Sequence, residues 1–469
     1  MTHVHFIGIG GSGLSAIARL LLEQGYRVSG SDRALSPLAT ELKAAGATVS
    51  IGHDADNITG ADWVVRSSAI PDDNVEVTAA LAAGIPVYKR ADFLGRLMEG
   101  KDGVAVAGTH GKTTTTAMIA WTLDQLGADP SFIIGGVSQN FGVNARAGKG
   151  STFVIEADEY DHMFLGLKPR FEVVTNIEHD HPDIYPTATG FHAAFLKFAK
   201  LLPENGALVI SGEDMGATKL AQEARQMGKR VIGYRIAESQ KTKGAEWILA
   251  QNVMANNLGG FTFNAIIRLQ SGPDYVSGVQ LQVPGLHNVR NALATLGVIG
   301  LLGYNMRDAA KALSGFKGTA RRFEIKGEAN GVIVIDDYAH HPTEINATLD
   351  AARARYPAKR IWAVWQPHTY SRTKTLFDDF IQSFGEADEI IVSEVYAARE
   401  PKEDFSAEKV VRAMNNPAAH FIPSLPEISD YLVSHLKSGD VLIVMSAGDA
   451  DSVSAEVLAQ LKKGEVQHD

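Results

Sequence analysis

The 469-residue chain contains no cysteine. Disulfide bonds, zinc sites built on thiolates and a cysteine nucleophile are therefore excluded, and the absence fits a protein of the reducing cytoplasm. No segment approaches the roughly 20 consecutive apolar residues needed to cross a bilayer, so we expect no membrane partner. The N-terminus leads directly into a predicted strand, without a basic region or a cleavage site, and we expect no signal peptide.

Runs of basic residues are also absent. The formal net charge is −10, from 44 lysines and arginines against 54 aspartates and glutamates. This balance argues against nucleic acid as a partner. Any anionic ligand must instead be held by glycine loops, helix N-termini and single arginines. Hydrophobic residues make up 45% of the chain, as in ordinary globular proteins, and the length suggests about three domains.

The central motif of the chain is an apolar strand that runs into a glycine turn and a helix, over residues 104–126. Two glycines of the turn allow successive N–H groups to point at one phosphate, a lysine adds positive charge, and a threonine offers its hydroxyl to Mg²⁺. The usual phosphate loop has a glycine where Val106 stands, and an ordinary turn with a solvated lysine is the alternative. The turn consists of Gly108, Thr109, His110, Gly111, Lys112, Thr113 and Thr114.

A second glycine turn, with the pattern GxGxxG, follows the predicted strand at residues 4–7. Asp32 ends the next predicted strand, an arrangement typical of dinucleotide sites. The same turn and helix N-terminus would accept any pyrophosphate, including that of a UDP-sugar. A further strand ends before Ser67 and Ser68, which we expect in a second loop of this site, although a plain turn is an equal alternative. The glycine turn includes Gly10, Gly11, Ser12 and Gly13.

Acidic and histidine side chains follow two predicted strands of the middle segment. The strand at 152–155 ends in EADEYD, which begins with Glu156, and the strand at 172–176 leads into IEHDHPD, which contains His181. Carboxylates at the ends of parallel strands, downstream of a phosphate loop, are placed to hold the Mg²⁺ of a nucleotide. A solvated acidic loop and a structural histidine are the alternatives.

Strands and helices alternate along the whole chain, and polar clusters follow the strands of the last segment as well. In a parallel sheet these clusters gather at one edge. We therefore predict an α/β protein of three domains. They are a Rossmann-like domain at 1–99, a central domain of the phosphate-loop type at 100–319 and a second Rossmann-like domain at 320–469.

Six motifs in this order resemble those of the Mur ligases of peptidoglycan synthesis, and the resemblance covers essentially the whole chain. With the opening HFIGIGGSGLSAIA, they are most similar to the branch of the family that adds the first amino acid. The motifs are GTHGKTTTT at 108–116, EADEYD at 156–161, NIEHDHPD at 176–183, GLHNVRNALA at 285–294, RRFE at 321–324 and DDYAHHPTEI at 336–345.

The resemblance implies an ATP-dependent ligase that acts on small molecules in the cytoplasm, as a monomer or a homodimer. In the family mechanism the lactyl carboxylate of UDP-N-acetylmuramate attacks ATP, and the amine of L-alanine then attacks the resulting acyl phosphate. The first domain would bind the UDP part, the central domain ATP and Mg²⁺, and the C-terminal domain the amino acid. NAD, nucleic acid and a membrane are not expected partners.

The resemblance also implies roles for individual residues. Lys112, Glu156 and His181 would be catalytic, and Thr113, Glu156 and His181 would bind the metal. Besides residues 108–114, the ATP contacts would be His287, Asn288, Asn291, Arg322 and Asp337. The UDP part would contact Gly10, Gly11, Ser12, Gly13, Asp32, Ser67 and Ser68, and the amino acid Tyr338, His340 and Arg372.

Three positions depart from the alanine-adding pattern: Tyr160, Thr369 and Ser446 stand where a serine, an arginine and a glycine are usual. They leave open a recycling ligase that attaches an L-Ala-γ-D-Glu-diaminopimelate tripeptide to the same UDP-sugar. Lys197 lies roughly where some Mur ligases carry a carbamylated lysine, a modification not expected here. A dehydrogenase would explain only residues 1–32, and a non-catalytic nucleotide-binding protein would be expected to lose part of the phosphate and metal motifs.

Overall fold

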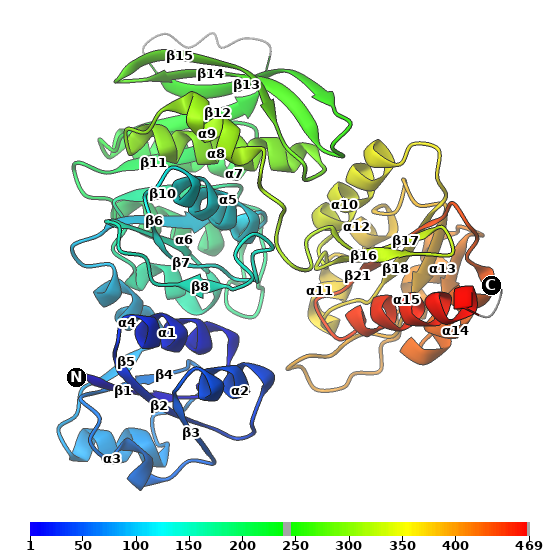
Figure 1. Ribbon diagram of the computed structural model, residues 1–469. Helices are drawn as coiled ribbons and strands as arrows, with labels where there is room; N and C mark the ends of the chain where they lie inside the picture. The colour runs from blue at the N-terminus through cyan, green and yellow to red at the C-terminus, as the bar shows by residue number, and fades with distance from the viewer. Residues whose placement is uncertain (238–244, 467–469) are drawn as a thin grey trace. The chain divides into compact units, whose positions relative to one another are not determined.

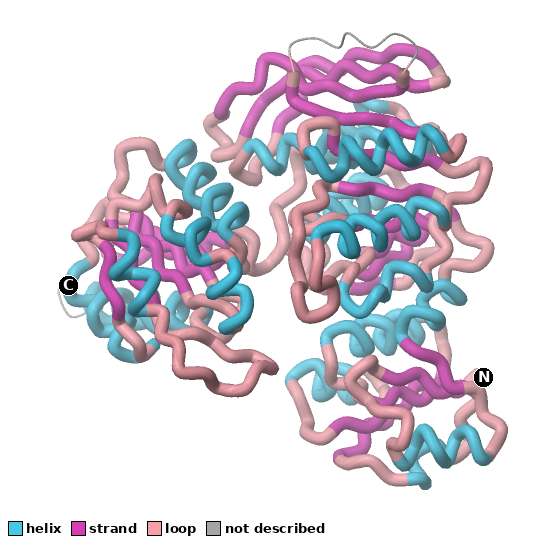
Figure 2. The backbone as a smooth tube through the Cα atoms, turned by 180° about the vertical axis from the view of Figure 1, so that it is seen from behind, coloured by secondary structure: helices cyan, strands magenta, loops and turns pink. Residues whose placement is uncertain are grey.

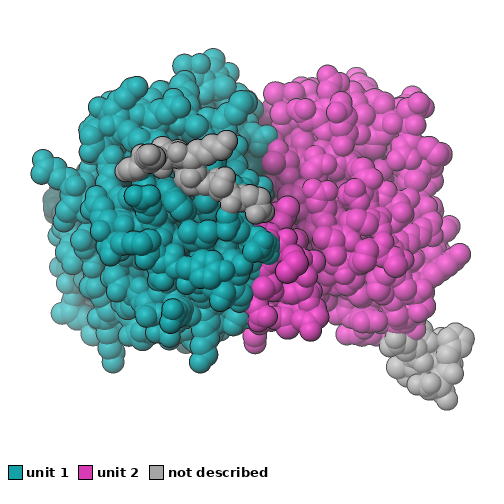
Figure 3. Space-filling view, turned by 90° about the horizontal axis from the view of Figure 1, so that it is seen from above, with its two compact units in different colours: residues 1–252, 263–279, 290–316 teal, residues 253–262, 280–289, 317–469 magenta. Residues whose placement is uncertain are grey.

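The computed structural model describes residues 1–237 and 245–466 of the chain (Figure 1). Three sheets follow one another along the sequence, each with helices between its strands, which confirms the predicted α/β class. The first sheet and most of the second belong to one compact unit and the third sheet to another. Figure 3 colours the two units. The units are residues 1–252, 263–279 and 290–316, and residues 253–262, 280–289 and 317–469.

The first sheet has five parallel strands in the order β3-β2-β1-β4-β5. Its central strand is buried along its whole length. Because the strands are parallel, the glycine turn after β1, the acidic end of β2 and the loop after β4 lie at one edge. The elements are β1 (His3–Ile7), α1 (Ser12–Glu23), β2 (Arg27–Asp32), α2 (Pro37–Ala44), β3 (Thr48–Ile51), η1 (Ala55–Ile58), β4 (Trp63–Arg66), α3 (Val75–Ala82), β5 (Val87–Lys89) and α4 (Arg90–Leu97).

The second sheet has ten strands in the order β15-β14-β13-β12-β11-β10-β6-β9-β7-β8. Strands β6 and β10 are parallel neighbours at its centre, so the loops that follow them meet at one edge. The elements as far as α6 are β6 (Asp102–Ala107), α5 (Lys112–Gln125), β7 (Ser131–Ile133), β8 (Ala145–Arg146), β9 (Thr152–Glu156), η2 (Tyr160–Gly166), β10 (Phe171–Val174) and α6 (Ala188–Lys200). The others are β11 (Ala207–Ser211), α7 (Met215–Gln226), β12 (Val231–Ile236), β13 (Glu246–Ala255), β14 (Phe261–Leu269), β15 (Gly272–Gln280), α8 (Leu286–Leu301) and α9 (Met306–Leu313).

The third sheet has six strands in the order β16-β17-β21-β18-β19-β20, of which only β16 runs antiparallel. Adjacent residues of β17, Val334 and Ile335, enter different apolar clusters because successive side chains point to opposite faces. Helices therefore cover both faces of this sheet (Figure 2). The elements are β16 (Glu324–Ala329), β17 (Val332–Asp337), α10 (Pro342–Arg355), β18 (Ile361–Trp365), α11 (Tyr370–Thr375), α12 (Phe377–Ile381), β19 (Glu389–Val392), α13 (Glu408–Met414), β20 (Ala419–Phe421), α14 (Leu425–His435), β21 (Val441–Met445) and α15 (Asp451–Val466).

Two helices begin earlier than the sequence predicts. Helix α1 begins at Ser12, within the predicted glycine turn at residues 10–13, and α5 begins at Lys112, within the predicted turn at residues 108–114. Both glycine turns are thus shorter than predicted. Among the described helices, none is long and apolar enough to cross a membrane.

Candidate active site

The loop between β6 and α5 has the backbone of a phosphate cradle. Gly108 has a φ of 135° and Gly111 a φ of 82°, conformations that favour glycine. A Cβ at position 108 would lie 2.0 Å from Thr175 Oγ1, so this position also requires glycine for space. Because α5 begins at Lys112, the N–H groups of its first turn are available to an anion at this loop.

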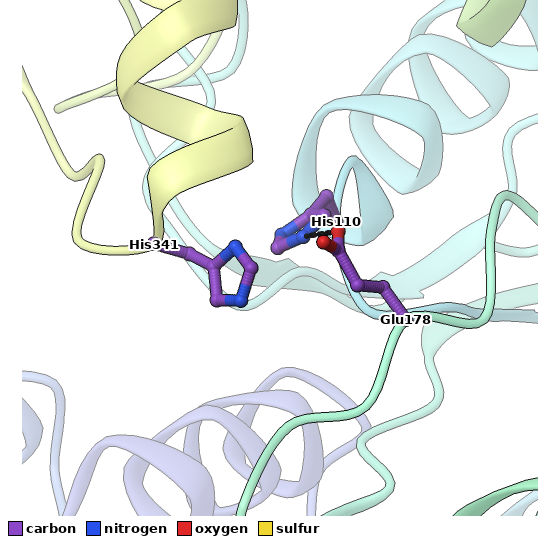
Figure 4. A group of neighbouring side chains, drawn as sticks. All are labelled: His110, Glu178 and His341. Atoms are coloured by element: carbon purple, nitrogen blue, oxygen red, sulfur yellow. Dashed lines mark hydrogen bonds and ion pairs between the residues drawn. The ribbon is translucent and has the colours of Figure 1, made fainter. Parts of the chain in front are cut away.

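The segment that follows β10 holds the phosphate loop in place. Thr109 Oγ1 donates a hydrogen bond to Glu178 O (2.7 Å) and accepts one from Glu178 N (2.9 Å). His110 N donates to Asn176 Oδ1 (2.9 Å), and Asn176 Nδ2 donates to His110 O (3.2 Å). The ring of His110 also donates from Nε2 to Glu178 Oε2 (2.9 Å), as Figure 4 shows. Two reciprocal pairs of hydrogen bonds and one contact of the His110 ring therefore fix the shape of the loop. This role of Asn176 and Glu178 was not predicted from the sequence.

Three oxygen atoms surround the Lys112 ammonium. Nζ donates to Gly108 O (2.6 Å), Thr109 O (3.2 Å) and Glu159 Oε1 (2.9 Å). Glu159 is 1% exposed, and His181 Nε2 lies 3.6 Å from its Oε1. Burial alone would raise the pKa of Glu159, but Lys112 and His181 hold that pKa below its usual range. The sequence analysis did not single out Glu159, although its place in EADEYD beside the candidate metal ligand was a signal.

Thr113 and Glu156 lie together, as the metal-site prediction requires. Thr113 Oγ1 donates to Glu156 Oε1 (3.0 Å), and Gly135 N donates to Oε2 (2.7 Å). Burial raises the pKa of Glu156, and Lys112 acts in the opposite direction. His181 Nε2 lies 3.6 Å from Glu159 Oε1 and 3.7 Å from Asp180 Oδ2. One hydroxyl and two carboxylates next to a phosphate loop are oxygen donors of the kind that Mg²⁺ prefers, so these residues fit that ion.

Backbone strain gathers around this acidic cluster. Asp161, His162 and His181 have φ values between 54° and 55°, which residues other than glycine seldom adopt. Tyr160, where the alanine-adding pattern has serine, lies with its ring centroid 5.2 Å from that of His181 and donates a hydrogen bond to Asp183 Oδ2 (3.1 Å). Strained positions of this kind are common at active sites.

The predicted adenosine contacts on α8 fall in different units. Asn291 belongs to the first unit, where its Oδ1 would lie 3.1 Å from a Cβ at Gly111, so it borders the phosphate loop. His287 and Asn288 belong to the second unit. Asn288 Nδ2 donates to Pro284 O (2.6 Å), just before α8 begins at Leu286.

The glycine turn of the first sheet meets the acidic end of β2. Gly10 N donates to Asp32 Oδ2 (2.8 Å), and a Cβ at position 10 would lie 2.8 Å from the same oxygen. Gly11 N donates to Gly8 O (3.1 Å), which closes the turn before α1 begins at Ser12. The predicted UDP residues of this turn therefore lie beside Asp32.

An arginine that the sequence analysis missed lies beside this turn. A Cβ at Gly13 would lie 2.1 Å from Arg90 Nη1, so the guanidinium occupies the space next to the glycine. Arg90 Nη2 also lies 3.7 Å from Asp158 Oδ2, in the acidic cluster of the second sheet. Ser67 N donates to Ile7 O (3.1 Å) at the same edge, and Ser68 is exposed beside it. Arg90 thus connects the glycine turn with the acidic cluster inside the first unit.

In the second unit, Asp337 lies at the end of β17 and is 5% exposed. It accepts hydrogen bonds from Phe323 N (2.6 Å) and Ala339 N (2.7 Å). Burial raises its pKa to about 6, and Arg322 acts in the opposite direction. Arg322 in turn donates to Glu344 Oε1 (3.4 Å). Arg322 and Asp337, the predicted phosphate and ribose contacts, therefore lie close to each other.

The three predicted amino-acid contacts also lie close to one another. The rings of Tyr338 and His340 are 5.3 Å apart, and those of His340 and His368 are 5.7 Å apart. Arg372, 7% exposed, donates from Nη1 to His368 Nδ1 (3.2 Å). His368 therefore joins the predicted residues, and its position at the end of β18 in the WQPH sequence was the available signal.

Two loop residues begin helices of the second unit. His341, also labelled in Figure 4, accepts the N–H of Thr343 through Nδ1 (3.3 Å) at the start of α10. Thr369 starts α11 with a φ of 66° and a ψ of 145°, a conformation that residues other than glycine rarely adopt. Its N–H donates to Tyr396 O (2.9 Å), which holds it there. The departure from the family pattern at this position thus coincides with a strained backbone.

Comparison with protein families matches all three segments of the chain. Residues 3–102 match the catalytic domain of the Mur ligase family, residues 106–299 the Mur ligase middle domain and residues 321–448 the glutamate ligase domain of Mur ligases. A UDP-N-acetylmuramate--L-alanine ligase of Roseiflexus sp. (strain RS-1) is 42% identical over 465 residues, which cover 98% of this chain and 99% of the relative. The enzyme of the same name from Thermobifida fusca is also 42% identical, over 98% of this chain and 96% of that enzyme.

Solved structures of the family have the same fold. UDP-N-acetylmuramate-alanine ligase MurC from Thermotoga maritima matches with a TM-score of 0.79 and 28% identity, over 99% of this chain and 100% of that one. A murein peptide ligase Mpl from Psychrobacter arcticus matches with a TM-score of 0.69 and 27% identity, over 98% of this chain and 99% of that one. These matches confirm the resemblance of the six motifs and the predicted fold, and the chain belongs to the Mur ligase family.

Proposed function

We propose that this chain joins L-alanine to the lactyl carboxylate of UDP-N-acetylmuramate, with ATP as the energy source, in the cytoplasmic synthesis of peptidoglycan precursors. The observation that carries the proposal is the arrangement of Lys112 and Thr113, on one phosphate loop, against the buried carboxylate of Glu159 and the half-buried carboxylate of Glu156. The named relatives, about 40% identical over nearly the whole chain, support L-alanine as the acceptor.

The chemistry begins with transfer of the γ-phosphoryl group. The lactyl carboxylate attacks the γ-phosphorus, the bond to ADP breaks, and an acyl phosphate forms. Lys112 and the N–H groups of the loop neutralise the charge that develops on the transferring group. Thr113, Glu156 and His181 would hold Mg²⁺ together with Glu159, and the bound ion would supply further positive charge at the phosphates. Asn291, which borders Gly111 of this loop, would contact the nucleotide.

Amide formation completes the reaction. The amine of L-alanine attacks the acyl carbon, and the tetrahedral species expels inorganic phosphate. In the second unit, Arg372 would pair with the α-carboxylate of the amino acid, and Tyr338 and His340 would line its pocket. Arg322 and Asp337 would contact the phosphate and ribose of ATP, with His287 and Asn288 on the adenine.

The UDP part of the substrate would lie at the glycine turn of the first sheet. The turn from Gly10 to Gly13 and the first N–H groups of α1 would bind the pyrophosphate, with Arg90 supplying a positive charge. Asp32 would accept a hydrogen bond from the ribose, and Ser67 and Ser68 would contact the ligand from the neighbouring loop. No step of the reaction takes place here, so this end of the molecule would contribute to affinity for the UDP-sugar.

The direct test is ADP release by the purified protein with ATP, Mg²⁺ and UDP-N-acetylmuramate. L-Alanine, glycine, L-serine and the L-Ala-γ-D-Glu-diaminopimelate tripeptide are compared as acceptors. We expect the highest kcat/KM with L-alanine. Turnover with the tripeptide alone would make the chain a recycling ligase, and turnover with none of the acceptors would contradict a ligase function.

A further inference from the structure

Glu76 is a buried carboxylate for which the proposed reaction provides no role. It lies in the first turn of α3 and is 0% exposed. Its Oε1 accepts hydrogen bonds from Asn57 Nδ2 (2.6 Å) and Asp54 N (3.2 Å), and its Oε2 accepts one from Ser31 Oγ (2.6 Å). His53 Nδ1 lies 3.6 Å from Oε2. One side chain of α3 therefore binds the end of β2 and the loop that follows β3.

The hydrogen bonds keep this carboxylate ionised. Burial alone would raise the pKa of Glu76, but hydrogen bonds from His5, Ser31 and Asn57 hold that pKa at about 2. At neutral pH the group is therefore an anion that accepts from every donor around it. An anion with this number of donors fixes their positions more strongly than a neutral acceptor would.

Two histidines of β1, His3 and His5, extend the contacts of Glu76 along the first sheet. His3 Nδ1 lies 2.8 Å from Gly60 O, so it carries a proton and donates it to that carbonyl. His3 Nε2 and His5 Nδ1 both contact Ser29 Oγ, at 2.7 Å and 2.8 Å, and the serine has only one proton to donate. His5 Nε2 faces Glu76 Oε2 at 3.4 Å and needs a proton to donate to it. Ser29 Oγ thus joins the two imidazoles, and His5 connects them to the carboxylate of Glu76.

The same residues connect Glu76 to the glycine turn. Ser31, whose hydroxyl is held by Glu76, accepts from Gly8 N (2.8 Å) and Ile9 N (3.1 Å) through its carbonyl oxygen. The next residue, Asp32, accepts from Gly10 N and, through its carbonyl oxygen, from Gly52 N (2.8 Å). Fixing Ser31 and the loop at 52–57 therefore also fixes Asp32 and the first half of the turn.

We propose that Glu76 is a positioning residue for the UDP-sugar: it holds the end of β2 and the loop at 52–57 where the glycine turn and Asp32 can receive the nucleotide. The inference rests on the proposed function only for the identity of the ligand. Glu76 is fully buried and does not itself touch the substrate. Its effect is therefore on affinity for the UDP moiety, and the phosphoryl-transfer site of the second sheet is left unchanged.

The test is the isosteric variant Glu76→Gln, which replaces one acceptor oxygen by an N–H₂ donor that faces other donors. We expect KM for UDP-N-acetylmuramate and the Kd for UDP by calorimetry to rise by roughly tenfold or more, since small displacements of positioning groups have effects of this size. The values of kcat, KM for ATP and KM for the amino acid should stay within about twofold. Equal KM and Kd values in the variant and the wild type would overturn the proposal.

Asp62→Asn is the matched control. The Asp62 carboxylate also binds β1, by accepting from His3 N (2.7 Å), but at the end of the strand opposite to the glycine turn. A purely structural role of Glu76 predicts that both variants lower the melting temperature and leave KM unchanged, and this result would also overturn the proposal. Should Glu76→Gln fail to fold, Ser31→Ala removes the bond between Glu76 and β2, together with the contact of Ser31 Oγ with His53 Nδ1 (3.1 Å), and should still raise the Kd for UDP. Binding of UDP is measured without ATP, so an inactive wild type that binds UDP would count against the proposed function alone.

Discussion

Replacing Lys112 by alanine tests whether phosphoryl transfer and UDP-sugar binding use separate sites of the first unit. The ammonium donates to two loop carbonyls and to Glu159, so the substitution removes three hydrogen bonds and the positive charge of the phosphate loop. The glycine turn that would hold the UDP-sugar belongs to another sheet. We therefore expect Lys112→Ala to abolish ligation while binding of UDP stays nearly unchanged.

The size of each effect follows from the contacts. Loss of a cation that stabilises a transferring phosphoryl group should lower kcat/KM by at least about 1,000-fold, equivalent to about 4 kcal/mol. Removing one partner of a buried ion pair lowers the free energy of unfolding by about 3–5 kcal/mol. We expect a loss near ~3 kcal/mol, because Glu159 keeps its contact with His181. The double variant Lys112→Ala/Glu159→Gln removes the unpaired carboxylate and should regain about 1–3 kcal/mol.

Three assays measure these quantities: ADP release, calorimetric titration with UDP, and urea unfolding of the wild type, the single variant and the double variant. Loss of UDP binding together with ligation would contradict the separation of the two sites. A double variant no more stable than Lys112→Ala would show that Glu159 is not the buried counter-ion of Lys112.

Two further predictions concern the acceptor and acid stability. Arg372→Ala should raise KM for the amino acid by about 10- to 100-fold with KM for ATP unchanged, because a charge-assisted hydrogen bond to the α-carboxylate is lost; an unchanged KM in steady-state kinetics would remove Arg372 from the pocket. The pKa of Glu76 lies at about 2 against an ordinary value of 4.5, so its carboxylate contributes about 3 kcal/mol of stability that is present above about pH 4.5 and lost as the pH falls toward 2. Unfolding curves of the wild type and Glu76→Gln should therefore converge on acidification, and a constant difference would refute this linkage.

The sequence was sufficient for the features that local rules determine. An apolar strand, a glycine turn and a helix follow one another at both glycine loops, and such units form parallel sheets with their polar ends at one edge. For this reason Lys112, Thr113 and Glu156 could be expected at one edge of the sheet, where Thr113 and Glu156 are in contact, and Asp32 could be expected beside its glycine turn.

Contacts that depend on how separate helices and strands pack could not be predicted from local sequence patterns. Which acidic residue of EADEYD reaches the lysine depends on the strained turn at Asp161, and nothing in the local pattern distinguishes Glu159 from Asp158. Arg90 lies beside Gly13 only because α4 packs at the edge of the first sheet. The anionic state of Glu76 depends on donors from β1, β2 and η1, which are far apart in sequence.

The central claim is that this chain activates a carboxylate with ATP and joins it to the amine of L-alanine. The most direct measurement is the dependence of ADP release on both UDP-N-acetylmuramate and L-alanine, with the joined product identified by mass spectrometry. The account predicts one ADP for each amide bond formed, and release that stops when either substrate is omitted. ADP release that is independent of the amino acid, or turnover with the tripeptide only, would contradict it.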